Sequence, residues 1–266
     1  MFPGKHQPQK ARWMALHFPH LALDLACAAS EQGGQGKPYA ISDTLKGRQV
    51  IIDCNPAASR AGIKIGMLAS AALTLADSLQ LLSREQRAEH DALERLAAWC
   101  YQYSSQISVV NPHNSLLLEV GASQRLFGPA HALGERIRTE ISKLGYQVSI
   151  GIAPTPEAAL LAGRHGLFID SVADIRFLIG QLDTDELALQ APQLQALQTM
   201  GFRRTADIFR LPRKALTRRL GLSVSYYLDR LLGNRPDPRK AFHPPGCFSA
   251  ARSEEHTSEL QSPDHL

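Results

Sequence analysis

The chain has 266 residues, of which 44% are hydrophobic and 20% charged, and its formal net charge is +4. This composition is ordinary for a soluble globular protein of one large or two small domains, and no apolar run reaches the roughly 18–20 residues that span a bilayer. The four cysteines show neither CxxC pairing nor metal-ligand spacing. This argues against a disulfide scaffold or zinc site and predicts a cytoplasmic protein with reduced thiols.

In chain order, the sequence begins with a polar stretch at residues 1–12, which predicts a flexible arm. Strands and helices are then expected as far as residue 165. The predicted strands are 13–18, 39–42, 49–53, 107–110, 116–120 and 147–152, and the predicted helices are 21–30, 57–61, 67–76, 84–104, 130–144 and 156–165. Arg84, Glu85 and Arg87 are interpreted as a solvated helix face. The order strand, helix, strand, strand, helix, strand predicts an α+β fold: a ferredoxin-like core at 13–165 with a subdomain inserted at about 27–75.

The pattern becomes wholly helical after this core. Short helices separated by Gly or Pro are expected within residues 166–232, followed by a Pro- and Arg-rich linker at 233–251. Residues 252–262 (RSEEHTSELQS) look like a translated sequencing adapter, although a polar disordered tail is the alternative. We therefore interpret 252–266 as an artefact and expect the natural protein to continue past Ala251.

Positive charge is concentrated in the helical region. Residues 201–251 contain nine Arg and two Lys against three Asp, a net charge of +8, whereas the first 200 residues are close to neutral. Residues 197–208 have the form of a helix-hairpin-helix, in which backbone N–H groups and a helix N-terminus face a DNA phosphate. A glycine that only caps a helix is the alternative. The candidate DNA-binding residues are Gly201, Arg203, Arg204, Lys214, Arg218 and Arg219.

Four segments together resemble the Y-family (UmuC/DinB-type) DNA polymerases. They are 13–26, 58–67 (ASRAGIKIGM), 112–121 (PHNSLLLEVG) and 149–162, which begins SIGIAP. The resemblance spans roughly residues 12–245 and implies a palm, an inserted fingers subdomain and a helical thumb that contains the helix-hairpin-helix.

Most positions that correspond to the family's functional residues are changed, although Glu119 remains, at a position that is not the family's main metal carboxylate. His17 stands at a metal-binding Asp, Ala22 at the bulky ribose-sensing residue, Pro56 and Ser59 at the Tyr and Arg that hold the triphosphate, and Asn114 and Ser115 at the catalytic Asp-Glu pair. Two-metal phosphoryl transfer needs several carboxylates converging on two ions. The resemblance therefore predicts no catalytic residue, no metal site and no cofactor.

Within the family, residues 116–128 and 151–162 are similar to the catalytically inactive ImuB subgroup. This similarity implies a subunit for translesion synthesis that binds primer–template DNA, a sliding clamp, a RecA-like partner and an error-prone polymerase. One alternative is an active, divergent polymerase that uses Mg²⁺ with Asp24 or Asp53 as replacement ligands. Another is an interaction module without DNA binding, against which the basic thumb argues.

Overall fold

The computed structural model describes residues 11–29 and 36–244. The predicted arm, except Ala11 and Arg12, and the adapter-like tail lie outside these ranges. Arg12 itself is held by Asp170, with Nη1 and Oδ1 2.7 Å apart. Within the described ranges, no helix is both long enough and apolar enough to cross a bilayer.

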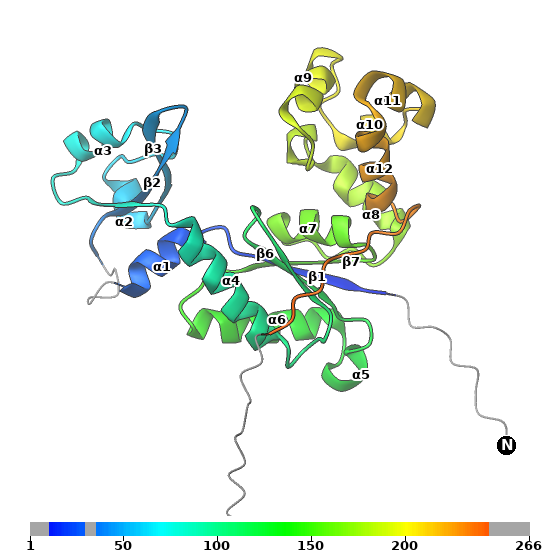
Figure 1. Ribbon diagram of the computed structural model, residues 1–266, viewed down its shortest axis with the longest axis horizontal. Coiled ribbons are helices and arrows are strands. Elements are labelled where there is room, and N and C mark those ends of the chain that lie inside the picture. The colour runs from blue at the N-terminus through cyan, green and yellow to red at the C-terminus, as the bar shows by residue number, and fades with distance from the viewer. Residues whose placement is uncertain (1–10, 30–35, 245–266) are drawn as a thin grey trace, which may run out of the picture.

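A four-stranded antiparallel sheet forms the centre of the molecule (Figure 1), in the order β5-β6-β1-β7. Its strands are β1 (Trp13–His17), β5 (Ile107–Val110), β6 (Ser115–Glu119) and β7 (Ser149–Ala153). The first and last strands lie side by side, as in a ferredoxin-like core. The register pairs His17 with Ser115 on β6, so both residues lie at the same end of the sheet.

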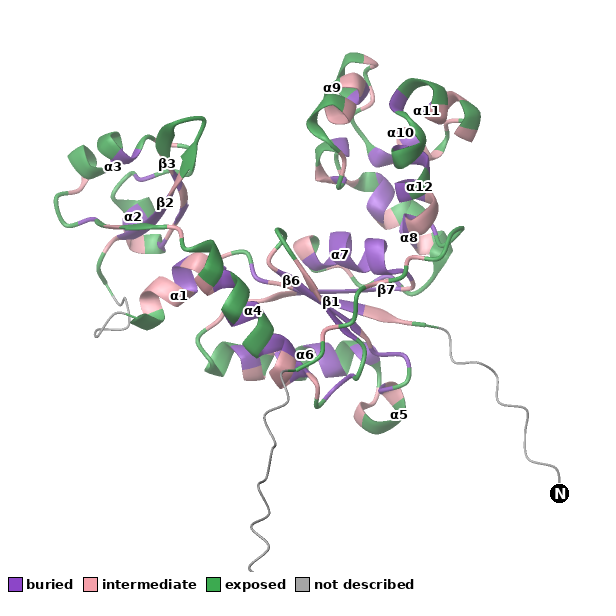
Figure 2. Cartoon of the chain, in the orientation of Figure 1, coloured by how far each residue is buried: buried purple, intermediate pink, exposed green. Residues whose placement is uncertain are grey.

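Side chains of β1 alternate between two hydrophobic layers. Met14 and Leu16 pack with helices α4 (Gln86–Cys100) and α6 (Ala130–Lys143). Ala15 packs on the opposite face with α7 (Pro156–His165). All three β1 side chains are fully buried, and Figure 2 shows the sheet and α7 as the buried centre of the chain.

Close backbone approach between α7 and the sheet requires two glycines. A Cβ on Gly151 would lie 2.1 Å from the backbone carbon of Ala162, and one on Gly163 would lie 3.0 Å from the Ala15 Cβ. The small side chains within 149–162 therefore allow α7 to pack closely on the sheet.

The inserted subdomain has its own three-stranded sheet. Its order is β3-β2-β4, formed by β2 (Tyr39–Leu45), β3 (Arg48–Cys54) and β4 (Gln80–Ser83), with helices α2 (Pro56–Arg60) and α3 (Ala69–Leu75) beside it. Helix α1 (Leu21–Ala29) connects it to the core. Strand β4 was not predicted and lies beyond the expected insertion at 27–75, yet it pairs in parallel with β2.

The remainder is helical apart from its last segment. The short α5 (Gln124–Phe127) precedes α6, and after α7 come α8 (Val172–Leu178), two 3-10 turns (Ile179–Gln181 and Thr184–Glu186), α9 (Ala191–Thr199), α10 (Thr205–Phe209), α11 (Arg213–Leu220) and α12 (Leu222–Leu231). The helices after α7 share one apolar cluster with it, which fixes them to that face of the sheet. Residues 233–244 then run back across the core without a helix or strand (Figure 1).

Candidate functional site

The ends of β1 and β6 bring His17 and Ser115 into contact. His17 Nδ1 lies 3.1 Å from Ser115 Oγ and 3.1 Å from the carbonyl oxygen of His113, to which Ser115 Oγ also donates at 2.8 Å. Burial lowers the pKa of His17, and the positive charge of Arg164 acts in the same direction, against the hydrogen bond to His113. The pair therefore presents a neutral imidazole and a hydroxyl at neutral pH.

Asn114, next to this pair, contacts the carboxylate of Glu89, a residue that was not among the predicted site residues. Its Nδ2 donates to Glu89 Oε2 at 2.9 Å. Glu89 is buried in α4 and accepts two further hydrogen bonds from Arg84, from Nε at 2.6 Å and from Nη2 at 2.9 Å. Arg84 also faces Asp43 on β2, at 3.5 Å.

This arrangement corrects the interpretation of Arg84 as part of a solvated helix face. Its side chain is 24% exposed and that of Glu89 is 4% exposed, so the pair bridges the core and the inserted subdomain. The Arg84 guanidinium is paired with both oxygens of Glu89, and Asn114 donates to one of them, so neither oxygen is left free to face a metal ion. The five-residue spacing of an Arg before a Glu at a helix start is the only signal that could have indicated the pair.

Asp24 and Asp53, the replacement ligands considered from the sequence, have other partners. Both oxygens of Asp53 lie 3.0 Å from His20 Nδ1, and Asp24 Oδ2 accepts from the backbone N–H of Gln147 at 2.8 Å. Burial raises the pKa of Asp24 to about 6. In the described part of the chain, no group of three or more His, Cys, Asp or Glu side chains is arranged to hold a metal ion.

Four positions that differ from the family's functional residues line three separate pockets. Pro56 and Ser59 on α2 line an open one of about 570 Å³, together with His20, Asp53 and Lys64. Ala22 lines another of about 400 Å³, beside Arg84 and Glu89. Ser115 lines a third of about 240 Å³, which faces the helical region. The structure thus joins Asn114, Ser115 and His17, but not Pro56 and Ser59, into one site.

The predicted hairpin lies between α9 and α10. Gly201 has φ +79°, and its N–H and that of Phe202 donate to the carbonyls of Gln198 and Leu197. A second glycine with positive φ, Gly221, joins α11 to α12. Both turns follow a helix and contain a glycine with positive φ, a conformation that glycine adopts at low cost.

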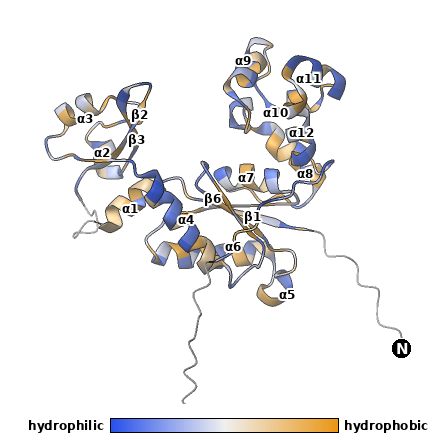
Figure 3. Ribbon diagram, viewed as in Figure 1, coloured by the Kyte–Doolittle hydropathy of each residue, from blue (hydrophilic) through white to orange (hydrophobic). Residues whose placement is uncertain are grey.

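The five candidate cations are all exposed. Three of them lie on α11, which is coloured as hydrophilic in Figure 3. The structure divides the five by their contacts. The side chains of Arg203, Lys214 and Arg218 have no ion pair or hydrogen bond to any residue that the structure describes. Arg204 Nη1 instead donates to the carbonyl of Gln181 at 2.5 Å and lies 3.3 Å from Asp183.

Arg219 brings the two turns together. Its Nη1 lies 3.4 Å from the sulfur of Met200, which directly precedes Gly201. Lys214 lies at the opposite end of α11, beside the α10–α11 turn. Arg219 and the two glycine turns therefore lie close together, with Lys214 farther along α11.

The sequence of this chain is similar to those of known proteins. A sequence model described as the impB/mucB/samB family matches residues 24–164. The Caulobacter vibrioides protein named ImuB is 28% identical over 174 residues, which cover 65% of this chain and 38% of that protein. A DNA polymerase IV of Aeromonas hydrophila is 25% identical over 232 residues, which cover 84% of this chain and 66% of that protein.

The fold has counterparts among solved structures. The crystal structure of DinB from Sulfolobus solfataricus matches with a TM-score of 0.65 at 19% identity, covering 86% of this chain and 69% of that one. This likeness confirms the predicted α+β fold with its palm and inserted fingers. The chain spans less than half the length of the ImuB relative.

Proposed function

Because the chain belongs to the impB/mucB/samB family, which is the UmuC/DinB-type domain of Y-family polymerases, we propose that it is a DNA-binding subunit of damage tolerance that does not itself incorporate nucleotides. The observation that carries this proposal is the bond between Asn114 and Glu89. At the position where the family resemblance expects a metal-binding carboxylate, an amide donates to an acid that Arg84 already neutralises.

The chemistry of phosphoryl transfer supports the lack of catalysis. Two Mg²⁺ ions bound in a polymerase are held by hard, negatively charged oxygen ligands. His17, Asn114 and Ser115 provide no negative charge. Asp24 and Asp53 are engaged by Gln147 and His20 instead.

DNA binding is proposed for the thumb surface formed by Gly201, Arg203, Arg204, Lys214, Arg218 and Arg219. Unpaired, exposed guanidinium groups can exchange water and counterions for phosphate oxygens without breaking an internal contact. We expect affinity that falls steeply with salt and depends little on base sequence. The clamp, RecA-like and polymerase partners implied by the family resemblance belong to the same proposal.

Primer extension tests the catalytic half. The chain is incubated with labelled primer–template, nucleoside triphosphates and first Mg²⁺, then Mn²⁺, while DNA binding is measured by anisotropy in the same samples. We expect binding without extension, with an active Y-family polymerase as the control. Extension by this chain would refute the proposal and support an active polymerase with a rearranged metal site.

Charge reversal tests the DNA-binding half. Arg203→Glu with Arg218→Glu removes two unpaired cations, and Arg87→Glu with Arg95→Glu, on exposed positions of α4, is matched in charge. The first pair should lower the slope of log affinity against log salt by about 2, whereas the second should leave it near the parent value. Arg204 is a poorer test because its contacts with Gln181 and Asp183 make it structural. Equal effects of the two pairs would mean that the thumb is not the DNA-binding surface.

A further inference from the structure

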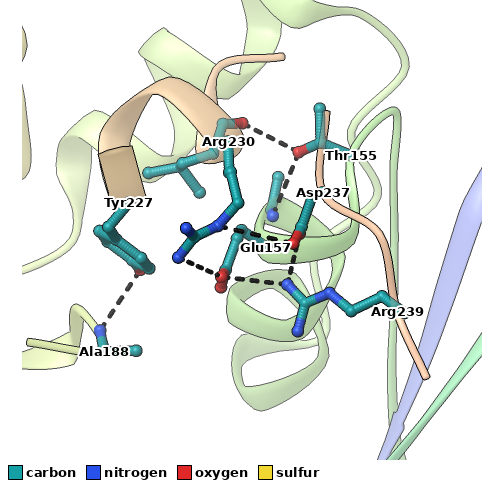
Figure 4. A network of polar contacts seen from close by, with 9 residues as sticks. Thr155, Glu157, Ala188, Tyr227, Arg230, Asp237 and Arg239 are labelled. Carbon is teal, nitrogen blue, oxygen red and sulfur yellow. Dashed lines mark hydrogen bonds and ion pairs between the residues drawn. The ribbon is translucent and has the colours of Figure 1, made fainter. Parts of the chain in front are cut away.

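Four charged side chains form an alternating cluster where α7, α12 and the last described segment meet (Figure 4). Glu157 Oε1 lies 3.0 Å from Arg239 Nη2 and 3.4 Å from Arg230 Nη2. Asp237 Oδ1 lies 3.5 Å from Arg230 Nε, and its other oxygen contacts Arg239 Nη2. Each acid therefore faces both arginines, and the cluster is neutral overall.

Burial makes each charge in the cluster depend on its partners. The side chain of Asp237 is 8% exposed, that of Glu157 12% and that of Arg239 18%. Charges removed from water to this extent are tolerated only when they are paired, and removing one partner leaves another charge uncompensated. Among these residues, Glu157 is the one contributed by the core.

Residues 233–244, which we name the strap, have further contacts at both ends. At its start, the N–H groups of Asn234 and Arg235 donate to the carbonyl of Asp229 on α12, and the Arg235 guanidinium lies 4.0 Å from the centre of the Tyr226 ring. At its far end, Phe242 donates its N–H to the carbonyl of Ile107 at 2.7 Å and accepts from Tyr101 Oη at 2.8 Å. The Phe242 ring packs on the apolar layer of α4 and α6. Between the cluster and Phe242, the strap passes around the β5 edge of the sheet and presents no buried apolar side chain.

The thumb, by contrast, does not depend on this cluster. Leu228 and Leu231 of α12 are fully buried in the same apolar cluster as Leu161 of α7. In addition, Thr155 Oγ1 donates to the carbonyl of Leu231 at 2.9 Å. Removing a charge from the cluster should therefore release the strap and leave the thumb in place.

We propose that Glu157 is a positioning residue that clamps the strap to the junction of palm and thumb. The clamp carries the chain from the α7 face of the sheet to the end of α4, so that whatever follows residue 244 starts at a fixed point on the palm. A linker attached to the thumb alone would let that point swing freely. This role is independent of the proposed DNA binding.

The test measures two distances by spin labelling of the full chain. Labels at Gln195→Cys on α9 and Ala241→Cys on the strap report on the strap, and labels at Gln195→Cys and Ala132→Cys on α6 report on the thumb. Cys27, Cys54 and Cys247 are replaced by serine, while the buried Cys100 is kept. The variant is Glu157→Gln, and the control is Glu94→Gln, which removes an exposed carboxylate paired only with His90.

We expect Glu157→Gln to broaden the 195–241 distance distribution and leave the 195–132 distribution narrow. Hydrogen exchange of the Phe242 amide should become on the order of tenfold faster, because its local opening is no longer opposed by the clamp. Glu94→Gln should change neither measurement. If Glu157→Gln does not fold, Arg239→Gln replaces it, because this change keeps both pairs of Arg230 and should free the strap in the same way.

An unchanged 195–241 distribution in a folded variant would overturn the proposal. Equal broadening of both distributions would also overturn it, because Glu157 would then hold the thumb and not the strap specifically. DNA titration of the same proteins keeps the two proposals apart. A chain that does not bind DNA but loses strap order in Glu157→Gln would refute the DNA-binding function and support the clamp.

Discussion

The palm and the thumb use the same charged residue types in opposite ways. In the palm, Arg84 and Glu89 are bonded to each other, and the acid is almost completely buried. On the thumb, Arg203 and Arg218 are exposed and unpaired among the described residues. Burial decides the difference, because a charge removed from water must satisfy an internal partner, whereas an exposed one stays available to a phosphate. The charges of Arg84 and Glu89 therefore help to hold the palm together, whereas those of Arg203 and Arg218 are available for the DNA contacts that we propose.

Among the palm substitutions, Gly151→Ala should have the largest effect on folding. The added Cβ would meet the backbone of Ala162 and Gly163 at 2.1 Å, a separation that no side-chain movement relieves. Strand β7 and helix α7 would have to move apart, so we expect almost no folded protein. Soluble yield and circular dichroism measure this, and a variant that melts like the parent would show that α7 does not pack this closely.

Glu89→Ala should have the next largest effect. It leaves Arg84 and Asn114 without their shared buried partner, which should lower the free energy of unfolding by about 3–5 kcal/mol. Urea denaturation measures the change. Glu85→Ala, an exposed acid at the start of the same helix, is the control and should stay within about 0.5 kcal/mol of the parent. Similar small losses for both variants would mean that the palm network contributes little.

The main strands of the palm could be predicted because their signals are local. The apolar run of β6 and the alternating burial of β1 follow from the sequence at those positions, and β1 ends within one residue of its predicted end. Strand β4 (Gln80–Ser83) was missed because its residues are mostly exposed and its pairing with β2 bridges some 40 positions of the chain.

The contacts of the candidate site were less predictable. His17 and Ser115 meet because their strands are in register, which a family pattern can anticipate. Glu89 and Glu157 owe their roles to residues distant in sequence, such as Asn114 and Arg239, and a surface acid has the same local pattern. The strap was interpreted as a linker for the same reason, since its polar composition does not reveal the ion pairs that hold it.

Asp24→Asn should give a smaller effect that depends on pH. Burial raises the pKa of Asp24 from 3.8 to about 6, so the folded state binds this proton more tightly than the unfolded state. The resulting stabilisation is complete below about pH 4 and is lost as the pH rises through 6. The asparagine carries no charge and should therefore be more stable than the parent at pH 7, by about 1–3 kcal/mol, with little difference at pH 4.

Urea denaturation at both pH values checks this prediction. The neighbouring His20 and Asp53 also influence the Asp24 charge, so His20→Gln serves as a control for their pair. A difference between parent and Asp24→Asn that is the same at pH 4 and pH 7 would contradict a buried, titrating carboxylate at this position.

Gly201→Ala is the thumb counterpart of Gly151→Ala and should have the smallest effect. No atom lies within 4 Å of the added Cβ, so the only penalty is the left-handed backbone at φ +79°. That conformation costs a non-glycine residue about 1–2 kcal/mol, or about 2–4 °C in melting temperature for a protein of this size. Gly134→Ala, in helix α6, is a useful contrast. Its Cβ would make an ordinary contact with the Ile150 side chain at 3.5 Å, so the substitution should not destabilise the fold. If Gly201→Ala also keeps DNA affinity, the phosphate contacts come from the arginines, whereas a parallel loss of affinity would show that the backbone of the hairpin itself contacts DNA.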